Sequence, residues 1–202
     1  RCFENPDIIH VESGIDPKRD IDIINLELIL SDLDVVTKRI TKVETKARTT
    51  KDKESVVEYN LLTKIKAVLE SEKSARSLDY TDDEKKLLSS YNLLTVKPIV
   101  YVANVAEEDY VNPENSQYYR VVEEIAKSEN AQCIPICANT ECELSQLPLE
   151  DKMEYLNSLG VSATGLDRLV QTTYALLNLS TFFTVGADEV RAWTFTNGMT
   201  AP

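Results

Sequence analysis

The sequence predicts an α/β fold that is interrupted by a helical arm and followed by a short β-rich segment. The arm is indicated by 80 consecutive residues, Lys18 to Lys97, that contain no glycine or proline, because such a stretch favours long helices. Short β-branched apolar runs then alternate with amphipathic runs, which is typical of strand–helix–strand units on a parallel sheet. Three regions are therefore expected. They are a partial α/β domain over 1–30 and 96–180, an inserted arm over 31–95, and the start of a small β-rich domain over 181–202.

The composition argues against several classes of protein. The 202 residues carry 22 basic and 34 acidic side chains, a net charge of −12, so a uniformly basic nucleic-acid-binding protein is not expected. No apolar run approaches the roughly 20 residues that a membrane-spanning helix needs. No signal peptide is recognisable, so we expect a cytoplasmic protein that does not bind membranes.

The few residues that commonly bind metals are poorly placed for a metal site. The chain has one histidine, His10, which argues against histidine-ligated metals and against a histidine-based catalytic triad. None of its four cysteines forms a C-x-x-C pair. We expect no metal site and four small, buried, reduced thiols. They are Cys2, Cys133, Cys137 and Cys142.

The arm is predicted to be an antiparallel helical hairpin. Its first helix is expected from about Ile21 to Arg48, about 40 Å long at a rise of ~1.5 Å per residue. Apolar residues recur along it at alternating spacings of three and four, which is a heptad seam made by Leu26, Ile29, Leu33, Val36, Ile40, Val43 and Ala47. A polar stretch follows, and then a second apolar stripe made by Val57, Leu61, Leu62, Ile65 and Leu69. Two stripes separated by a short polar stretch indicate two helices that pack side by side.

A third helix is expected after the hairpin, because Thr81 and Glu84 have the spacing of a capping box. This helix would carry Leu87, Leu88 and Tyr91. The α/β region should then consist of two buried strands and three helices. The strands are expected over Pro98–Ala103 and Cys133–Ala138, with Pro135 at an edge or early position, and the helices over Pro113–Ser128, Leu149–Leu159 and Gly165–Leu179. Within the helix over 113–128, one side is expected to carry Tyr118, Val121, Val122 and Ile125. Gly160 is expected to be the C-terminal cap of the helix over Leu149–Leu159.

The last segment alternates as strands do. Phe182–Val185 and Val190–Phe195 are the expected strands, and Asn197-Gly198 is a strong turn signal. The chain begins at Arg1 without a methionine, with Arg1-Cys2-Phe3 resembling the end of a strand, and stops just after this turn. We therefore expect the sequence to be part of a longer protein.

The arm carries a local excess of positive charge. Between Lys38 and Lys66 there are nine basic and four acidic residues. Such a basic tip would contact RNA without drawing the acidic body onto it. The candidate contacts are Lys38, Arg39, Lys42, Lys46, Arg48, Lys51 and Lys53. The alternative is an ordinary solvated coiled-coil surface, on which mixed charges are routine.

Two polar segments follow the two buried strands. Asn104-Val105-Ala106-Glu107 comes after the first strand, and Cys137-Ala138-Asn139-Thr140-Glu141 comes after the second. Ligands of open α/β sheets bind beyond the carboxyl ends of the strands, and an amide side chain there suits the edge of a nucleobase. The alternative is two ordinary strand-to-helix loops. No G-x-x-x-x-G-K-[ST] loop is present, so the chain offers no Walker-type site for phosphates or Mg²⁺, and we assign it no catalytic residue.

Several runs resemble the Obg-like ATPase (YchF) family of P-loop proteins, in the family's order and over nearly the whole chain. The first runs are Arg1-Cys2-Phe3-Glu4, His10-Val11, Asp16-Pro17-x-Arg19-Asp20-Ile21 and Ile24-Asn25-x-Glu27-Leu28. Later runs are Lys97-Pro98-x-x-Tyr101-Val102-Ala103-Asn104-Val105, Gly165-Leu166-Asp167-x-Leu169, and Phe182-Phe183-Thr184-x-Gly186-x-x-Glu189-Val190-Arg191-Ala192-Trp193-Thr194. The run around Glu189 to Trp193 is specific, whereas the arm matches through generic heptads.

The resemblance implies the C-terminal part of a P-loop G domain with an inserted coiled-coil arm, followed by the start of a TGS domain. It also implies binding and hydrolysis of ATP in preference to GTP, with Mg²⁺, by the full-length protein. The family's N-x-x-E motif would be Asn104 and Glu107, Val105 would replace the lysine of GTPases, and Cys137-Ala138 would occupy the base-contacting S-A position. The implied partners are a nucleotide and, through the arm and the TGS domain, the ribosome or RNA, without specificity for DNA.

The phosphate half of that site would lie before Arg1. We therefore expect the 202 residues alone to bind no nucleotide tightly and to be inactive as a hydrolase, because phosphoryl transfer depends mostly on positioning the phosphates and stabilising their charge. Two alternatives remain. One is an interaction module that works without nucleotide, a helical hairpin on a degenerate α/β base. The other is a GTPase of relaxed specificity.

Overall fold

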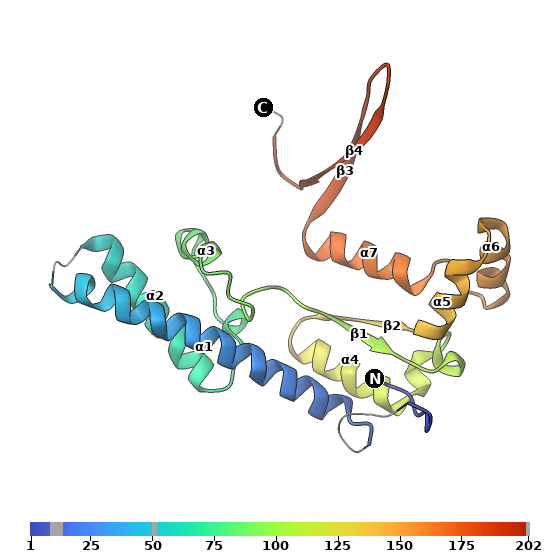
Figure 1. Cartoon of the computed structure of the whole chain (residues 1–202), viewed down its shortest axis with the longest axis horizontal. Coiled ribbons are helices and arrows are strands. Elements are labelled where there is room, and N and C mark those ends of the chain that lie inside the picture. The colour runs from blue at the N-terminus through green and yellow to red at the C-terminus, as the bar shows by residue number, and fades with distance from the viewer. Residues whose placement is uncertain (9–13, 50–51, 201–202) are drawn as a thin grey trace. The chain divides into compact units, whose positions relative to one another are not determined.

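The computed structural model describes residues 1–8, 14–49 and 52–200. The chain forms two compact units, one made by Arg1–Pro17 with Ile99–Pro202 and the other by Lys18–Pro98 (Figure 1). His10 and Lys51 lie outside the described residues. Within the part of the chain that is described, no helix is long and apolar enough to cross a membrane.

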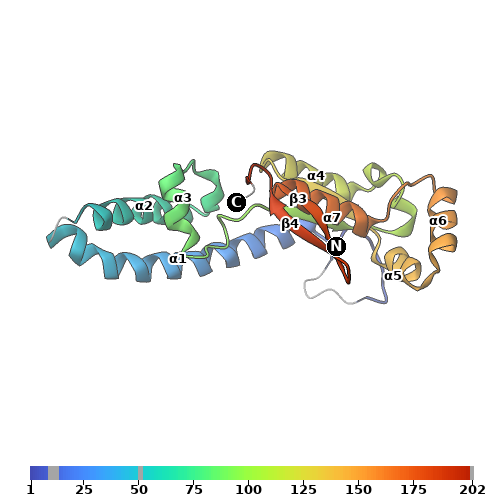
Figure 2. The same cartoon turned by 90° about the horizontal axis from the view of Figure 1, so that it is seen from above.

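The arm unit is a helical hairpin with a short third helix. Helix α1 (Pro17–Thr49) lies beside α2 (Lys53–Glu70), and α3 (Asp82–Ser89) follows the short 3₁₀ turn η1 (Ala75–Ser77) (Figures 1 and 2). The three helices enclose one apolar core that consists of Ile29, Val36, Leu61, Leu62, Ile65, Leu69, Ala75, Leu88 and Leu93. The predicted hairpin is confirmed, and the capping box of α3 forms as expected, with the Glu84 N–H donating to Thr81 Oγ1 and the Thr81 N–H donating to Glu84.

The predicted burial was wrong for the first residue of each apolar stripe of the arm. Leu26 was placed on the seam but is 42% exposed, because α1 has 33 residues whereas α2 has 18 and covers only part of it. Val57 is 55% exposed because it borders a surface groove between α2 and α3. Helix α1 also starts earlier than expected, at Pro17 rather than Ile21, since proline is well tolerated in the first turn of a helix.

The connection after α3 is tied to α1 by a buried carboxylate. Asp32 is 2% exposed and accepts hydrogen bonds from the N–H of Leu94 at 2.9 Å and from the N–H and hydroxyl of Thr95 at 2.7 and 2.6 Å. The carbonyl oxygen of Thr95 in turn accepts from the N–H of Arg76 at 2.9 Å. One aspartate therefore holds the end of the arm unit to its longest helix.

The second unit contains the strand–helix–strand element that the sequence predicts. Strands β1 (Val100–Asn104) and β2 (Gln132–Ile136) are parallel, and their register runs from Val100 opposite Gln132 to Asn104 opposite Ile136. Cys2 forms a single parallel bridge with Val105, so the start of the chain has the expected strand character at that residue. Pro135 lies in β2, which pairs only with β1 among the described strands, as an edge strand should.

Helix α4 (Gln117–Ser128) links the two strands, after the short 3₁₀ turns η2 (Glu107–Asp109) and η3 (Pro113–Asn115). Its buried residues are Tyr119, Val122 and Ala126. Of the four residues that were predicted to share one side, Val122 is buried and Tyr118, Val121 and Ile125 are half-buried. Apolar residues occur in adjacent pairs along this helix and fit two neighbouring faces. Packing on the sheet selects one of them, and Tyr118 instead donates a hydrogen bond from its hydroxyl to Glu4 at 2.6 Å.

Helix α5 (Ala138–Gln146) begins directly after β2, where a loop was expected. The local sequence hides this helix because Cys137, its N-cap residue, makes no side-chain capping bond. Instead, the free N–H of Ala138 donates to Asn104 Oδ1 at 3.1 Å, across 34 residues of sequence. The cap of α5 is thus supplied by the end of β1.

The remaining elements are two helices and a hairpin. Helix α6 (Leu149–Ser158) is followed by Gly160 at a φ of +73°, as expected for a C-terminal cap, and α7 (Gly165–Leu176) opens with a capping box of Thr164 and Asp167. Helix α7 ends before the predicted Leu179 because that residue starts β3. Strands β3 (Leu179–Val185) and β4 (Val190–Thr196) pair antiparallel, with Phe182 opposite Trp193.

Candidate functional site

A groove of about 540 Å³ lies at the carboxyl ends of β1 and β2. Its walls come from three segments that are far apart in the sequence. They are the N-terminal residues Phe3, Glu4, Asn5 and Ile8, the end of β1 with Asn104, Val105, Ala106 and Glu107, and the start of α5 with Cys137, Ala138, Asn139 and Cys142. The fold therefore brings all five predicted base-contacting residues to one groove and adds a wall that the sequence reasoning missed.

Asn104 links the two predicted segments directly. Its Oδ1 accepts the N–H of Ala138, so the orientation of the amide is set by the first turn of α5. Its Nδ2 group then has no protein partner among the residues that the structure describes. A fixed amide donor beside exposed backbone suits a ring nitrogen or exocyclic oxygen of a planar base.

Val105 and Cys137 support the groove more than they fill it. Val105 is 2% exposed, and its N–H donates to the carbonyl oxygen of Ile136 at 2.9 Å. Cys137 is 3% exposed at the start of α5, whereas Ala138 is exposed. The backbone at position 105 is thus held between β2 and the N-terminal segment, and the small Ala138 leaves room at the helix end.

Glu107 is exposed at the start of η2, and its carboxylate faces Tyr155 of α6. Burial, and next the negative charge of Glu107, raise the pKa of Tyr155 above its ordinary value. The carboxylate remains accessible to an N–H donor of a ligand. Tyr155 was not singled out from the sequence, because nothing in the pattern of α6 links it to a residue 48 positions earlier.

The N-terminal wall is the part of the site that sequence reasoning missed. Phe3 is half-buried, and its ring offers a face on which a planar base can stack. Asn5 carries a short Asx turn, in which its Oδ1 accepts the N–H of Asp7 at 2.8 Å. The strand-like run Arg1-Cys2-Phe3 was the available signal, since Cys2 pairs beside the end of β1.

The start of α5 is braced against α7 by Glu141. Its Oε1 accepts the N–H of Gly165 at 2.6 Å and the hydroxyl of Tyr110 at 3.0 Å, and its Oε2 accepts the N–H of Leu166 at 3.3 Å. A carboxylate at the start of α7 is also favoured by the helix dipole. Glu141 was expected to be part of a ligand loop, and the structure gives it this supporting contact instead.

The cysteines differ in exposure. Cys2 and Cys137 are buried as expected, Cys133 is half-buried, and Cys142 is exposed, so the prediction of four buried thiols was wrong for Cys142. Burial raises the pKa of Cys133 to about 12. Over residues 1–8, 14–49 and 52–200, no three His, Cys, Asp or Glu side chains form a group that could hold a metal ion.

The basic residues of the arm divide into paired and unpaired sets. Lys38 pairs with Asp34 at 2.5 Å, Arg39 pairs with Glu58 at 2.6 Å, and Arg48 pairs with Glu44 at 2.8 Å. These ion pairs reduce the charge that three of the predicted contacts can offer to a ligand.

Lys42 and Lys46 have no ion-pair partner among the described residues. They follow Lys38 at four-residue spacing, so the three lysines form a stripe along α1 beside the buried Val36 and Val43. Lys53 stands at the start of α2, in the groove between α2 and α3.

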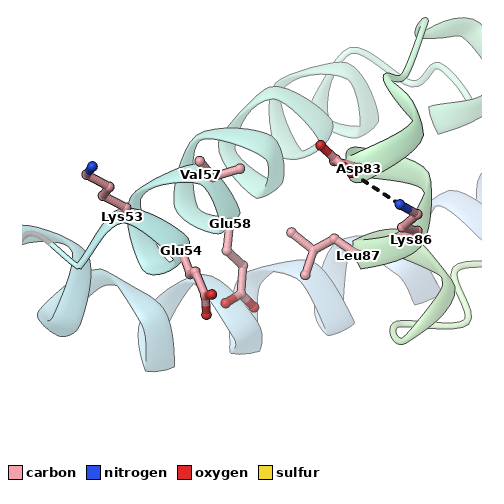
Figure 3. A pocket seen from close by; sticks show the side chains of 7 residues that line it. All are labelled: Lys53, Glu54, Val57, Glu58, Asp83, Lys86 and Leu87. Atoms are coloured by element: carbon pink, nitrogen blue, oxygen red, sulfur yellow. Dashed lines mark hydrogen bonds and ion pairs between the residues drawn. The ribbon is translucent and has the colours of Figure 1, made fainter.

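That second groove, about 530 Å³ in volume, has mixed charge (Figure 3). It is lined by Lys53, Glu54, Val57, Glu58, Asp83, Lys86 and Leu87. Within it, Lys86 pairs with Asp83 at 3.4 Å, and Glu58 is engaged by Arg39 and by the hydroxyl of Tyr91. The groove therefore lacks the positive surplus that an RNA-binding surface needs.

Comparisons with known proteins relate the whole chain to one group. No protein-family model matches it. It is 46% identical over 202 residues to the ribosome-binding ATPase YchF of Bacillus subtilis (strain 168), covering 100% of this chain and 55% of that protein. It is also 46% identical to the protein of that name from Haemophilus influenzae, with 100% and 54% coverage. The solved structure of the Schizosaccharomyces pombe YchF GTPase matches with a TM-score of 0.85 at 31% identity, over 99% of this chain and 54% of that one. The chain spans about half the length of these relatives.

Proposed function

The chain belongs to the YchF family, since it is similar to members of that family over its whole length. We propose that it supplies the base-binding half of a nucleotide hydrolase site and a helical arm that contacts the ribosome. The observation that carries the first part is the bond from the Ala138 N–H to Asn104 Oδ1, which joins both strand-end segments in one groove. In this assignment, 1–30 and 96–180 form part of the G domain, 31–95 the arm, and 181–202 the start of a TGS domain.

The base that this site prefers is adenine. A guanine-specific site needs a carboxylate at close range to accept the two N–H groups of the guanine edge. Here the carboxylate of Glu107 is one methylene longer than an aspartate and faces Tyr155, and the apolar Val105 stands where GTPases carry a lysine. Asn104 Nδ2 then meets the base without a requirement for guanine.

The triphosphate and Mg²⁺ would be held by residues outside this chain. The 202 residues contain no G-x-x-x-x-G-K-[ST] loop. We expect them to release no phosphate from ATP above background, because positioning of the phosphates supplies most of the catalysis. The check is steady-state phosphate release by the purified chain; activity that is lost in an Asn104→Ala variant would contradict the proposal.

Base binding is tested with the chain itself. We expect adenosine 5′-monophosphate to bind with a Kd of about 1 mM, or about −4 kcal/mol, because only the base and ribose are held. Titration of the ¹⁵N-labelled chain should shift the amide signals of Ala138 and of Val105 beside Asn104. Asn104→Ala should weaken binding at least about tenfold, or about 1.4 kcal/mol.

Guanosine 5′-monophosphate serves as the competing ligand in the same titration. Asn60→Ala, on the exposed surface of α2, is the matched control and should leave binding unchanged. The absence of any shift at the groove would refute the base site and favour the interaction module. Binding of the guanosine nucleotide more than about tenfold tighter would refute the adenine preference.

The arm's proposed partner is ribosomal RNA, contacted by the lysine stripe Lys38, Lys42 and Lys46. Lysines four residues apart on a helix are separated by ~6 Å along its axis, which is close to the distance between successive phosphates of an RNA strand. Lys42 and Lys46 form no ion pair in the described part of the chain, although the charge of Lys46 contributes to lowering the pKa of Asp52. Lys53 and the paired arginines would add weaker contacts.

The arm proposal predicts a specific change in salt dependence. Replacing both Lys42 and Lys46 by glutamine should reduce the slope of log K against log[salt] for RNA binding by about 1.5, because two phosphate contacts are lost. The measurement is a fluorescence-anisotropy titration with ribosomal RNA at several salt concentrations. The control replaces Lys85 and Lys86, which pair with Asp82 and Asp83 on α3. Equal effects of the two double variants would show that net charge, and not the stripe, governs binding.

A further inference from the structure

The N-terminal wall of the strand-end groove has no regular secondary structure. Residues Phe3 to Ile8 form turns and bends, and isolated turns of this length are not stable by themselves. Their backbone must therefore be held by other groups. Two contacts fix the beginning of the segment, since the N–H of Cys2 donates to the carbonyl oxygen of Asn104 at 2.7 Å and the Tyr118 hydroxyl donates to Glu4 at 2.6 Å.

Arg1 holds the rest of the segment. Its guanidinium donates to three backbone carbonyl oxygens, from Nε to Phe3 at 3.0 Å, from Nη1 to Ile8 at 2.9 Å, and from Nη2 to Asn5 at 3.0 Å. These three carbonyl groups lie at the start, the middle and the end of the wall. One side chain therefore closes the segment into a loop.

The same guanidinium stacks on the ring of Phe3, with its central carbon 4.7 Å from the ring centroid. Phe3 lines the groove, whereas Arg1 does not. The guanidinium thus packs against the ring, and the ring still lines the groove. A cation–π contact of this kind restrains the ring as well as the backbone.

We propose that Arg1 is a positioning residue for base binding, which closes the Phe3–Ile8 loop and sets the Phe3 ring as one wall of the groove. This inference rests on the proposed function of the groove. Arg1 does not touch the base; it acts through the ring and the backbone that do. Lysine cannot replace it, because a single ammonium group cannot reach three separated carbonyl oxygens and has no plane to stack on the ring.

The test measures the affinity of the whole chain for adenosine 5′-monophosphate by NMR titration. Arg1→Lys keeps the charge and should weaken binding about tenfold, with shifts in the unbound spectrum confined to the N-terminal wall. Arg191→Lys is the control, since Arg191 is an exposed arginine paired with Glu189 at 2.9 Å. It should bind the nucleotide as the wild type does.

A double-mutant cycle with Phe3→Ala separates positioning from a general structural role. If Arg1 acts through the Phe3 ring, the Arg1→Lys, Phe3→Ala double variant should bind no more than about twofold more weakly than Phe3→Ala alone. Two outcomes would overturn this inference and still support the base site. One is that the losses of binding free energy in the two single variants add up in the double variant. The other is that Arg1→Lys binds the nucleotide as the wild type does, while Asn104→Ala abolishes the NMR shifts at the groove. Absence of nucleotide binding by the wild type would instead refute the base site itself.

Discussion

We expect the Asp32→Ala variant to lose about 3–5 kcal/mol of unfolding free energy. The carboxylate is 2% exposed and accepts three hydrogen bonds, from the N–H groups of Leu94 and Thr95 and from the Thr95 hydroxyl. Alanine removes the acceptor of all three donors and leaves the two from Thr95 buried without it. The measurement is urea unfolding followed by the circular dichroism of the helices, which are concentrated in the arm.

Asp34→Ala is the matched control for this prediction. Asp34 lies two residues further along α1, is exposed, and pairs with Lys38 at 2.5 Å. An exposed pair of this kind contributes at most about 1 kcal/mol. If the two variants lost the same stability, the effect would come from helix propensity or net charge, and the buried carboxylate would have no special role.

Gly165→Ala should destabilise the α/β unit by about 1–3 kcal/mol through overpacking. A β-carbon at this buried position would lie 2.8 Å from Glu141 Oε1 and 2.9 Å from Ile136 Cγ1. The methyl group would push away the carboxylate that accepts the Gly165 N–H, so the brace between α5 and α7 would loosen. Thermal unfolding checks the stability, and the affinity for adenosine 5′-monophosphate reports on the start of α5.

Gly186→Ala is the matching change at a site with space. The nearest atom to an added β-carbon there is the Glu189 carbonyl oxygen at 3.6 Å, an ordinary contact. Both variants reduce the entropy of the unfolded chain by the same amount, which stabilises each by up to about 1 kcal/mol. If Gly165→Ala were as stable as Gly186→Ala, the contact between α5 and α7 would accommodate the added methyl group with no loss of unfolding free energy.

The elements that the sequence predicts well are those specified by neighbouring residues. The absence of glycine and proline and the spacing of Leu61, Leu62 and Ile65 indicate the helices of the arm. Thr81 and Glu84 specify the start of α3 because a capping box joins residues only three apart. Pro98–Ala103 and Cys133–Ala138 predict two buried strands, and these pair in parallel as expected.

The errors occur where a distant residue supplies what the local sequence lacks. Helix α5 was missed because its first N–H is capped by Asn104, which no pattern around Cys137 can show. The burial of Tyr119 and Ala126 in α4 was not predicted, because the apolar residues of this helix fit two faces and packing on the sheet selects between them. Leu26 was placed in the seam because a heptad pattern does not reveal the length of the partner helix.

The candidate site shows the same division. From the sequence alone, Asn104, Val105 and Glu107 and the pair Cys137-Ala138 were selected, since each group follows a buried strand. The tertiary structure added the wall formed by Phe3 and Asn5, and it showed that Lys38, Arg39 and Arg48 already have acidic partners.

By itself, then, the sequence determined most elements of this protein, α5 excepted, and the chemistry at the ends of its strands. Those features depend on backbone propensity, periodic burial and capping, which act within one or two turns of chain. Only the tertiary structure decided which groups meet. Asp32 reaches Thr95 across 63 residues, Asn104 reaches Ala138 across 34, and Arg1 organises a wall that becomes part of a site only beside β1 and α5. Contacts of that range form when burial of apolar surface brings distant segments together, and no local pattern encodes them.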